Sequence, residues 1–228
     1  MTVLIDGDIV AYRAAYSTEG GHADDVADKV DELMDYILDA TTFDGSPFKV
    51  YLTGDGNFRY DVAVTVPYKG NRRDTKKPEF LPDARDYLVE DYGAVVSSGE
   101  EADDLIAIEA TRLGPHTIIA SVDKDFLQVP CVHYNTNKQT FTEQDELSAT
   151  RFFYTQILTG DRADNIQGLH RVGPVKAAMI LGESTDEVEM YNKCVEAYEG
   201  NVDRVIENAR LLWLRREEGQ LWHPPEAG

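Results

Sequence analysis

Residues 2–8 read Thr-Val-Leu-Ile-Asp-Gly-Asp, an apolar and partly β-branched run that ends in two acids around a glycine. The run predicts a buried strand, and the Asp-Gly-Asp triplet predicts the turn that ends it. The same pattern recurs at residues 117–122, which lead into Asp123-Lys124-Asp125, and at residues 49–53, which lead into Gly54-Asp55-Gly56. Strands that end in acids therefore define the expected fold.

Helices are expected between these strands. Apolar side chains recur with helical spacing at Val30, Leu33, Met34, Ile37 and Leu38, and further helices are expected over 82–92 and 101–113, with a short strand at 94–97. Strands that alternate with helices predict an α/β fold with a mainly parallel central sheet flanked by helices. After Phe141 the pattern becomes helical, so we expect a core over 1–142 and a helical region over 143–228 with a loose C-terminal tail.

Length and composition narrow the class of protein. The chain has 228 residues, enough for one large domain with or without a small appendage. No apolar run is long enough to cross a bilayer, and the first residues lack the features of an export signal. The two cysteines, Cys131 and Cys194, cannot form a disulfide framework. We therefore expect reduced thiols, a cytoplasmic location and no membrane partner.

The charge balance is strongly acidic. Lysine and arginine total 22 and aspartate and glutamate 42, which gives a formal net charge of −20 at pH 7. A nucleic-acid-binding surface normally carries a basic excess. Such a chain should repel DNA unless its acids are gathered in one place, so the distribution of the acids decides the function.

Many of the acids occur where a ligand site would form. Strand ends carry Asp6, Asp55, Asp123 and Asp125, and the carboxyl edge of an open parallel sheet is where ligands bind. Glu101 and Asp104 are three residues apart at a helix start, with Asp103 beside them, and Asp161 and Asp164 have the same spacing. If these carboxylates converge, hard divalent cations such as Mg²⁺ would relieve their repulsion. Taken singly, each acid could equally be a turn residue, a helix cap or a solvated charge.

Two further segments could contact phosphates. Residues 69–77 carry five basic residues and one acid and form the centre of a basic strap over 68–80. The strap could hold a phosphate backbone, although most charge runs are solvated loops. Gly168-Leu-His-Arg-Val-Gly173 lies between helical flanks and could present backbone N–H groups to phosphates, although an ordinary helix–helix turn explains it as well.

The ordered set of motifs resembles the 5′-nuclease superfamily, the flap endonucleases and 5′→3′ exonucleases with a PIN-like core. The motifs are Leu4-Ile-Asp6-Gly with Ala11-Tyr12-Arg13, Asp55 with Phe58-Arg59, Tyr68-Lys69-Gly-Asn-Arg72, Glu101-Ala-Asp103-Asp104, Ser121-Val-Asp123-Lys-Asp125-Phe and Gly160-Asp161-Arg-Ala-Asp164-Asn-Ile-Gln-Gly168 running into Gly173. They cover roughly residues 2–180. Lys76-Lys77-Pro78 and the lack of a polymerase domain make the chain most similar to bacteriophage 5′→3′ exonucleases.

The resemblance implies roles for named residues. The metal ligands would be Asp6, Asp55, Glu101, Asp103, Asp123 and Asp125, with Asp104 in the same cluster and Asp161 and Asp164 in a second metal region. Lys69 and Arg72 would contact the scissile phosphate as catalytic residues. DNA would be bound by Tyr68, Arg73, Lys76 and Lys77 of the strap, and by Gly168, Gly173 and Lys176 of a helix–hairpin–helix over 160–184. Asp8 and Glu100 are additional acids without an implied role.

The implied activity is hydrolysis of phosphodiesters near DNA 5′ ends by a mechanism with two metal ions about 4 Å apart. The implied cofactors are Mg²⁺, for which Mn²⁺ could substitute, and K⁺ at the helix–hairpin–helix. The implied substrates are double-stranded, nicked or flapped DNA, with RNA–DNA hybrids as a further class. The setting would be phage DNA replication in a bacterial cytoplasm, alongside replication proteins.

Two other functions fit parts of the sequence. Asp6-Gly7-Asp8 matches the opening of haloacid-dehalogenase-like phosphohydrolases, in which Asp6 would form a phospho-aspartate. Gly160-Asp161-Arg-Ala-Asp164 fits the late acidic motif of that class, but the interpretation gives no purpose to Asp55, Glu101, Asp103, Asp104 or the hairpin. A catalytically silent module that binds DNA ends is the other alternative, although a dead site has no reason to keep a self-repelling acidic cluster.

Overall fold

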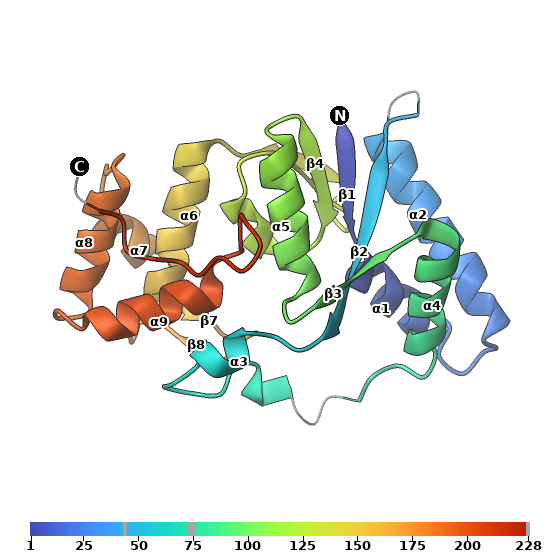
Figure 1. Ribbon diagram of the computed structural model, residues 1–228, viewed down its shortest axis with the longest axis horizontal. Helices are drawn as coiled ribbons and strands as arrows, with labels where there is room; N and C mark the ends of the chain where they lie inside the picture. The colour runs from blue at the N-terminus through green and yellow to red at the C-terminus, as the bar shows by residue number, and fades with distance from the viewer. Residues whose placement is uncertain (43–44, 73–75, 227–228) are drawn as a thin grey trace. The chain divides into compact units, whose positions relative to one another are not determined.

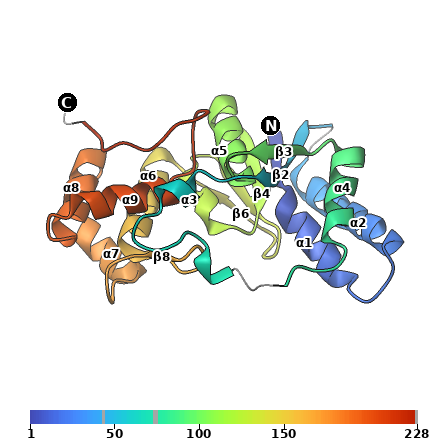
Figure 2. The ribbon, with the colours of Figure 1, turned by 60° about the horizontal axis from the view of Figure 1, so that its bottom comes forward.

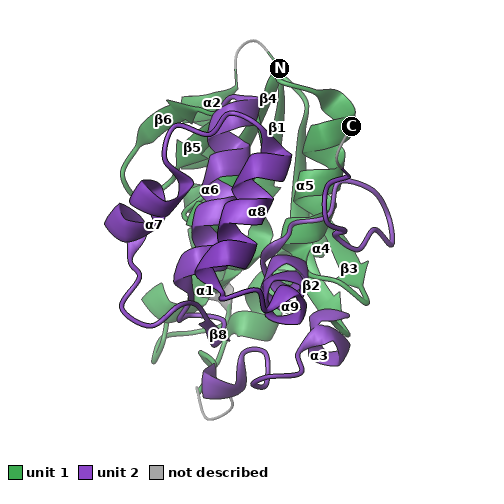
Figure 3. Cartoon of the chain, turned by 90° about the vertical axis from the view of Figure 1, so that its left-hand side faces the viewer, with its two compact units in different colours: residues 1–57, 76–144 green, residues 58–75, 145–228 purple. Residues whose placement is uncertain are grey.

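The computed structural model describes residues 1–42, 45–72 and 76–226, and the chain forms two compact units (Figure 1, Figure 3). Unit 1 comprises Met1–Asn57 and Lys76–Gln144, and unit 2 comprises Phe58–Thr75 and Asp145–Gly228. The expected catalytic core, 1–142, included the whole basic strap. The structure divides this strap, because its first part packs within unit 2 and Lys76 onward belongs to unit 1. Arg73, an expected DNA contact, lies outside the described residues.

Unit 1 is built on a six-stranded sheet with the strand order β3-β2-β1-β4-β5-β6. Its elements are β1 (Thr2–Asp6), α1 (Gly7–Ser17), α2 (Asp24–Thr41), β2 (Phe48–Asp55), α4 (Leu81–Tyr92), β3 (Val95–Ser98), α5 (Ala102–Leu113), β4 (Thr117–Ser121), the 3₁₀ turn η2 (Lys124–Gln128), β5 (Val132–Asn135) and β6 (Thr140–Glu143). Every neighbouring pair is parallel except β5 and β6. The expected parallel sheet is confirmed.

Helices cover both faces of this sheet. Helices α1, α2 and α4 pack together on one face, and α5 covers the other (Figure 2). Successive side chains of β1 point to opposite faces. Val3 and Ile5 accordingly join the cluster formed with α1, α2 and α4, whereas the equally buried Leu4 lies outside it. A sheet covered on both faces explains the continuous apolar runs in the sequence.

The first helix begins immediately after the first strand. Asp6 caps α1, with its side chain accepting a hydrogen bond from the Ile9 N–H, so Gly7 is already helical. A side chain at Gly7 would place its Cβ 2.7 Å from the Tyr51 carbonyl oxygen. Glycine therefore lets α1 start against β2. The sequence predicted only a turn here, since the Asp-Gly-Asp triplet hides the helix start.

Unit 2 is mainly helical. Its elements are α3 (Arg59–Val62), the 3₁₀ turn η1 (Gly70–Arg72), α6 (Glu146–Thr159), β7 (Gly160–Asp161), β8 (Ile166–Gln167), α7 (Pro174–Leu181), α8 (Glu187–Ala197) and α9 (Val202–Leu212). Its core contains Phe153, Tyr154, Ile157, Met190 and Trp222, all nearly inaccessible to solvent. Trp222 anchors the chain just before the tail that was expected to be loose. Across the described residues, none of the helices is both long and apolar enough to span a membrane.

Two side chains fasten residues 58–65 to α9. Arg59 is 2% exposed, and its guanidinium donates to the carbonyl oxygens of Leu211 at 2.9 Å and Trp213 at 2.8 Å. Glu207 accepts hydrogen bonds from the N–H groups of Val64 and Thr65 at 2.8 and 2.7 Å. A buried arginine that satisfies helix C-terminal carbonyls is costly to remove. These contacts hold residues 58–65, which lead into the strap, within unit 2.

Candidate active site

Asp6 occupies the carboxyl end of β1, where it is 4% exposed. Its Oδ2 accepts a 2.7 Å hydrogen bond from the Ser121 hydroxyl at the end of β4. Burial raises the pKa of Asp6 to about 7. The hydrogen bonds from Ser121 and the Ile9 N–H lower it, and the negative charges of Asp8 and Asp123 raise it. A buried carboxylate among other acids is a position at which a cation would be strongly favoured.

Asp123 and Asp125 follow β4 at the same edge of the sheet. Asp123 caps η2, and its Oδ1 accepts a hydrogen bond from the Asp125 N–H at 2.9 Å. The Asp123 N–H in turn donates to the Ser121 hydroxyl oxygen at 3.0 Å. Ser121 thus links the ends of β1 and β4, and with them Asp6 and Asp123.

Glu101, Asp103 and Asp104 lie at the start of α5. Glu101 and Asp104 form a capping box, in which the Glu101 N–H donates to Asp104 Oδ2 at 3.2 Å and the Glu101 side chain accepts from the Asp104 N–H. Asp104 is fully buried. This arrangement gives Asp104 a structural duty at the helix start. Its place in the metal cluster remains a prediction.

Asp55 is exposed at the end of β2, one residue after Gly54. A Cβ at Gly54 would lie 2.0 Å from the Ser97 carbonyl oxygen, so glycine allows β2 and β3 to approach here. The register of the β2–β3 pair shifts between Leu52 and Asp55. The irregularity turns the end of β2 at the residue that was expected to bind metal.

The unit 1 acids share one edge of the sheet but do not form a closed cluster. Among the described residues, no group of three or more Asp, Glu, His or Cys side chains is close enough to hold a metal ion. The positions of these acids in the sequence predicted that they would converge. Local partners explain the difference, because Asp104 caps α5 and Asp8 pairs with Arg85, while the other acids repel one another. The individual metal assignments remain predictions.

Asp161 and Asp164 belong to unit 2. Asp161 is 4% exposed, and its Oδ1 accepts from the N–H groups of Ala163 at 2.7 Å and Asp164 at 3.3 Å. Asp164 accepts hydrogen bonds from the Tyr68 hydroxyl and from Arg72, both at 2.8 Å. Asp164 therefore has a phenol and a guanidinium as partners, and its place in the second metal region remains a prediction.

Lys69 and Arg72, the strap residues that were expected to contact phosphate, are held by Asp164 and its neighbours. Lys69 Nζ lies 3.8 Å from Asp164 Oδ1, and the Lys69 N–H donates to the Asp164 carbonyl at 2.9 Å. Lys69 itself adopts a positive φ of 51°, an uncommon conformation for a side-chain-bearing residue. The Arg72 Nε–H donates to the Ala163 carbonyl oxygen at 2.9 Å. Within unit 2, Tyr68, Lys69 and Arg72 therefore gather around one carboxylate.

The expected hairpin residues take different positions. A Cβ at Gly168 would lie 2.2 Å from the Thr159 carbonyl carbon, so Gly168 permits close packing on the end of α6. Gly173 caps α7 and has open space around its Cβ position. Lys176 is exposed in the first turn of α7.

The last basic residues of the strap lie in unit 1. Lys76 and Lys77 are exposed there, and Lys76 Nζ lies 4.0 Å from Glu19.

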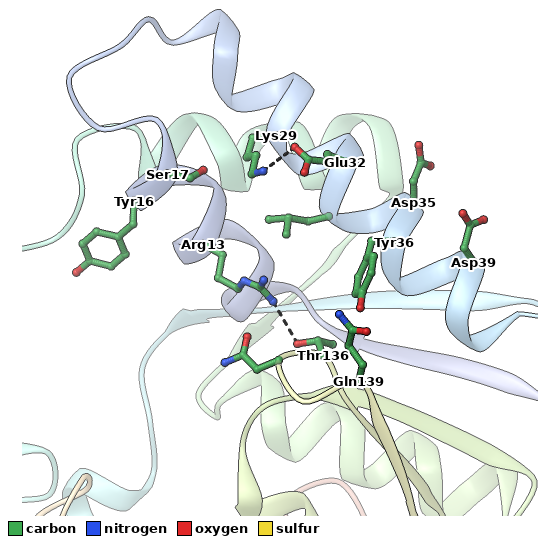
Figure 4. A pocket seen from close by; sticks show the side chains of 12 residues that line it. Arg13, Tyr16, Ser17, Lys29, Glu32, Asp35, Tyr36, Asp39, Thr136 and Gln139 are labelled. Carbon is green, nitrogen blue, oxygen red and sulfur yellow. Dashed lines mark hydrogen bonds and ion pairs between the residues drawn. The ribbon is translucent and has the colours of Figure 1, made fainter.

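A groove of about 940 Å³ lies between α1, α2 and the turn after β5 (Figure 4). Arg13 donates to the Thr136 hydroxyl across it at 3.5 Å, and Lys29 pairs with Glu32 at 2.6 Å. Arg13 and Thr136 also line a small cavity next to Asp6. The α2 wall carries the acids Glu32, Asp35 and Asp39, which makes the groove unsuited to a phosphate backbone.

Sequence comparison with proteins of known family shows which family this chain belongs to. No protein-family model matches the chain. The flap endonuclease Xni of Shewanella halifaxensis is 31% identical over 192 residues, which cover 77% of this chain and 75% of that protein. The chain belongs to the flap endonuclease family, within the 5′-nuclease superfamily. The Xni protein of Shewanella piezotolerans is 32% identical over 152 residues, and the match spans 59% of each chain.

Solved structures agree with this family membership at the level of the fold. A bacteriophage T5 protein co-crystallized with metal ions has a TM-score of 0.74 at 16% identity, covering 92% of this chain and 88% of that one. The bacteriophage T5 flap endonuclease in a pseudo-enzyme-product complex with DNA and metal ions has a TM-score of 0.71 at the same identity and coverage. The expected α/β fold is therefore confirmed for this flap endonuclease family member.

Several residues that organise the site had no role in the sequence analysis. Ser121 and Arg13 appeared there only as parts of motifs, and Arg85 and Thr53 did not appear as candidates. Ser121 is marked in the sequence only by its place two residues before Asp123. Arg85 carries no local signal, since its partner Asp8 is 77 residues away.

Proposed function

We propose that this chain is a divalent-metal-dependent 5′ nuclease that hydrolyses phosphodiesters near DNA 5′ ends, as an exonuclease, a flap endonuclease or both. The observation that carries the proposal is that Ser121 links the buried Asp6 to the exposed Asp123 at the carboxyl edge of a parallel sheet. The family membership supports the same activity. The first two relatives are matched over 59% and 44% of their own lengths, so the activity of the whole protein is proposed here from the site.

The donor atoms at this edge suit Mg²⁺ or Mn²⁺. They are carboxylate oxygens, which hard divalent cations prefer. Among softer donors, Cys131 and Cys194 are buried, and His133 bonds the Val129 carbonyl oxygen at 2.8 Å. The proposed metal ligands are Asp6, Asp55, Glu101, Asp103, Asp123 and Asp125, with Asp104 in the same cluster and a second region at Asp161 and Asp164. A bound divalent ion would lower the pKa of a coordinated water and neutralise charge on the phosphate.

The chain's own groups provide the remaining chemistry. Lys69 and Arg72 balance charge on the non-bridging phosphate oxygens, a role that positively charged clamps have in phosphoryl transfer. Asp164 holds both side chains within unit 2 and fixes their direction before DNA arrives. Ser121 keeps the Asp6 carboxylate oriented by its hydrogen bond. DNA contacts come from Tyr68, Arg73, Lys76 and Lys77 in the strap and from Gly168, Gly173 and Lys176 around α7.

Finer features extend the same proposal. Residues 160–184 act as a helix–hairpin–helix that binds duplex DNA and holds K⁺. The substrates are double-stranded, nicked or flapped DNA, and RNA–DNA hybrids are a further substrate class. The setting is a bacterial cytoplasm, in phage DNA replication together with replication proteins.

The haloacid-dehalogenase alternative is disfavoured by Asp8. That chemistry needs a free acid two residues after the nucleophile. Here Asp8 Oδ1 pairs with Arg85 and Oδ2 accepts the Thr53 N–H at 2.9 Å. The silent DNA-end-binding module remains a second candidate, because locally satisfied acids such as Asp104 and Asp164 do not need a metal. The nuclease and the binding module differ in whether the protein cleaves the DNA that it binds.

The test uses 5′-labelled overhang, blunt, nicked, flapped and RNA-primed substrates with Mg²⁺, Mn²⁺ or EDTA. The proposal expects short labelled products with either metal and none in EDTA. Retention of DNA without any product in both metals would support the binding module. Phosphate release from small phosphoesters with a trapped phospho-Asp6 would support the dehalogenase-like chemistry.

A further inference from the structure

Strand β2 runs past the end of its partner strand β1. The last paired residues are Asp6 and Tyr51, and β2 continues to Asp55. The position opposite Thr53 is occupied by Asp8, which already belongs to α1. The backbone N–H and C=O of Thr53 therefore have no strand partner on this side, and a half-buried backbone requires one.

Two side chains supply the missing partners. The Thr53 N–H donates to Asp8 Oδ2 at 2.9 Å, and Arg85 Nη2 donates to the Thr53 carbonyl oxygen at 2.5 Å. Arg85 Nη1 closes the ring with a hydrogen-bonded ion pair to Asp8 Oδ1. The side chains of Arg85 and Asp8 are only 25% and 23% exposed, so solvent screens the pair weakly. The side chains of Asp8 and Arg85 thus make the two hydrogen bonds to Thr53 that a neighbouring strand would otherwise make.

The bonds continue from Thr53 to the start of α5. The Thr53 hydroxyl oxygen accepts the Ala102 N–H at 3.0 Å. One residue later, the Gly54 N–H donates to Ser97 Oγ at 3.0 Å, and this hydroxyl donates to the Glu100 carbonyl oxygen at 2.6 Å. The end of β2 is therefore bonded to α1, β3 and the first turn of α5. Asp55, Glu101 and Asp103 are carried by the segments that these bonds join.

We propose that Asp8 and Arg85 are positioning residues that hold the metal-binding acids of β2 and α5 in place. The inference rests on the proposed function and deepens it. Carboxylates that repel one another tend to separate, and the ends of strands and helices resist this only if their backbones are fixed. An arginine that bonds both a carboxylate and a backbone carbonyl provides such fixation, since its planar fork donates in two directions.

The geometry separates this role from direct metal binding by Asp8. Both of its oxygens have partners, one charged and one from the backbone. Loss of the pair should leave the acids in the chain but weaken their arrangement. Mutation of a residue that orients metal ligands without touching the metal typically lowers metal affinity or activity about 10- to 100-fold.

The test compares Asp8→Asn and Arg85→Gln with matched controls. Asp8→Asn keeps an acceptor for Thr53 and removes the charge, and Arg85→Lys keeps the charge and removes the fork. The controls are Asp31→Asn, whose carboxylate accepts from the Tyr87 and Tyr92 hydroxyls, and Arg112→Gln, which pairs with Glu109 on α5. For each variant we would measure the thermal unfolding midpoint and its increase with Mg²⁺, which gives the Mg²⁺ concentration for half of the maximal increase. The single-turnover cleavage rate is measured with saturating flapped DNA.

The expected result is that Asp8→Asn and Arg85→Gln need about 10- to 100-fold more Mg²⁺ and cleave more slowly by a similar factor, while their DNA Kd is unchanged. The double variant should be no worse than the single ones, because the partners act together. Arg85→Lys should recover only part of the loss. Folded variants with the wild-type Mg²⁺ midpoint and rate would overturn the inference.

The same measurements distinguish a failure of the proposed function from a failure of the positioning role. If wild type cleaves no DNA, the proposed function fails, and the Mg²⁺-induced change in thermal midpoint still compares wild type with the variants. A wild-type midpoint that Mg²⁺ does not change would overturn the positioning role as well. Equal losses in the Asp31→Asn and Arg112→Gln controls would show a general effect of weakened folding and would also overturn it.

Discussion

The Ser121 hydroxyl donates a 2.7 Å hydrogen bond to the Asp6 carboxylate, across 115 residues of sequence. The same oxygen accepts the Asp123 N–H at 3.0 Å. One small side chain therefore fixes the ends of the two central strands, where the proposed metal ligands begin. This bond also lowers the pKa of Asp6 against the opposing effect of burial.

Replacing Ser121 by alanine should weaken metal binding without unfolding the chain. Asp6 would lose a donor that favours its charged form, so its pKa would rise further and it would attract Mg²⁺ less. We expect the Mg²⁺ midpoint for cleavage to rise about 10- to 100-fold. Ser17→Ala is the control, because Ser17 only donates to the Ala14 carbonyl oxygen at the end of α1. An unchanged midpoint in Ser121→Ala would contradict this role.

Lys69→Ala should slow the chemical step and leave DNA affinity nearly intact. The lysine is held beside Asp164 and is proposed to balance charge that develops on the phosphate. The expected loss is about 100- to 1000-fold in the single-turnover rate at saturating DNA. Lys29→Ala, which removes an ion pair with Glu32 on α2, should change neither quantity. Weaker DNA binding with a wild-type single-turnover rate would refute the assignment of Lys69 to the phosphate.

The two hairpin glycines should respond differently to alanine. A Cβ at Gly168 would overlap backbone atoms of Thr159, so we expect Gly168→Ala to cost about 1–3 kcal/mol in the free energy of unfolding. Gly173 has open space at this position, and Gly173→Ala should stay within about 0.5 kcal/mol of wild type. Urea unfolding measures both. Only Gly173→Ala can then report on DNA binding alone, and equal stabilities would contradict the packing role of Gly168.

His133 should make unit 1 less stable in acid. The imidazole is 8% exposed and donates from Nε2 to the Val129 carbonyl oxygen, and burial lowers its pKa below the usual 6.5. The unfolded chain therefore binds a proton that the folded chain resists, so the stability contribution is present above about pH 6.5 and is lost as the pH falls below it. Denaturant midpoints at pH 7.5 and 5.5 should differ less in His133→Gln than in wild type. The same difference in both proteins would contradict this.

The sequence predicted those parts of the fold that depend on local pattern. Helices such as α2 and α5 and strands β1 and β4 lie where periodicity and β-branched runs placed them. Helix α1 was hidden by the Asp-Gly-Asp triplet, and β5 and β6 were not predicted. Asp6 is both the last residue of β1 and the cap of α1, so the strand pattern hid the helix start, and β5 and β6 have four residues each, too short for a clear alternating pattern.

The site was predictable as a set of acids but not as an arrangement. Motif order identified the flap endonuclease family, and strand ends placed Asp6, Asp55 and Asp123 at one edge. The partners that hold them, Ser121 and Arg85, lie 115 and 77 residues from the acids they bond. Asp164 is expected at a metal, and its salt bridge to Arg72 within unit 2 was not predicted. Side-chain pairs at such separations follow from tertiary packing alone.

The most direct test of a metal-dependent nuclease is cleavage of 5′-labelled flapped DNA by Asp123→Asn at saturating Mg²⁺. Asparagine keeps the acceptor for the Asp125 N–H, so the fold should survive, and Asp31→Asn serves as the isosteric control. We expect a single-turnover rate at least about 100-fold below wild type, since a metal ligand should matter no less than the residues that position it. A folded Asp123→Asn protein that cuts as fast as wild type would contradict it.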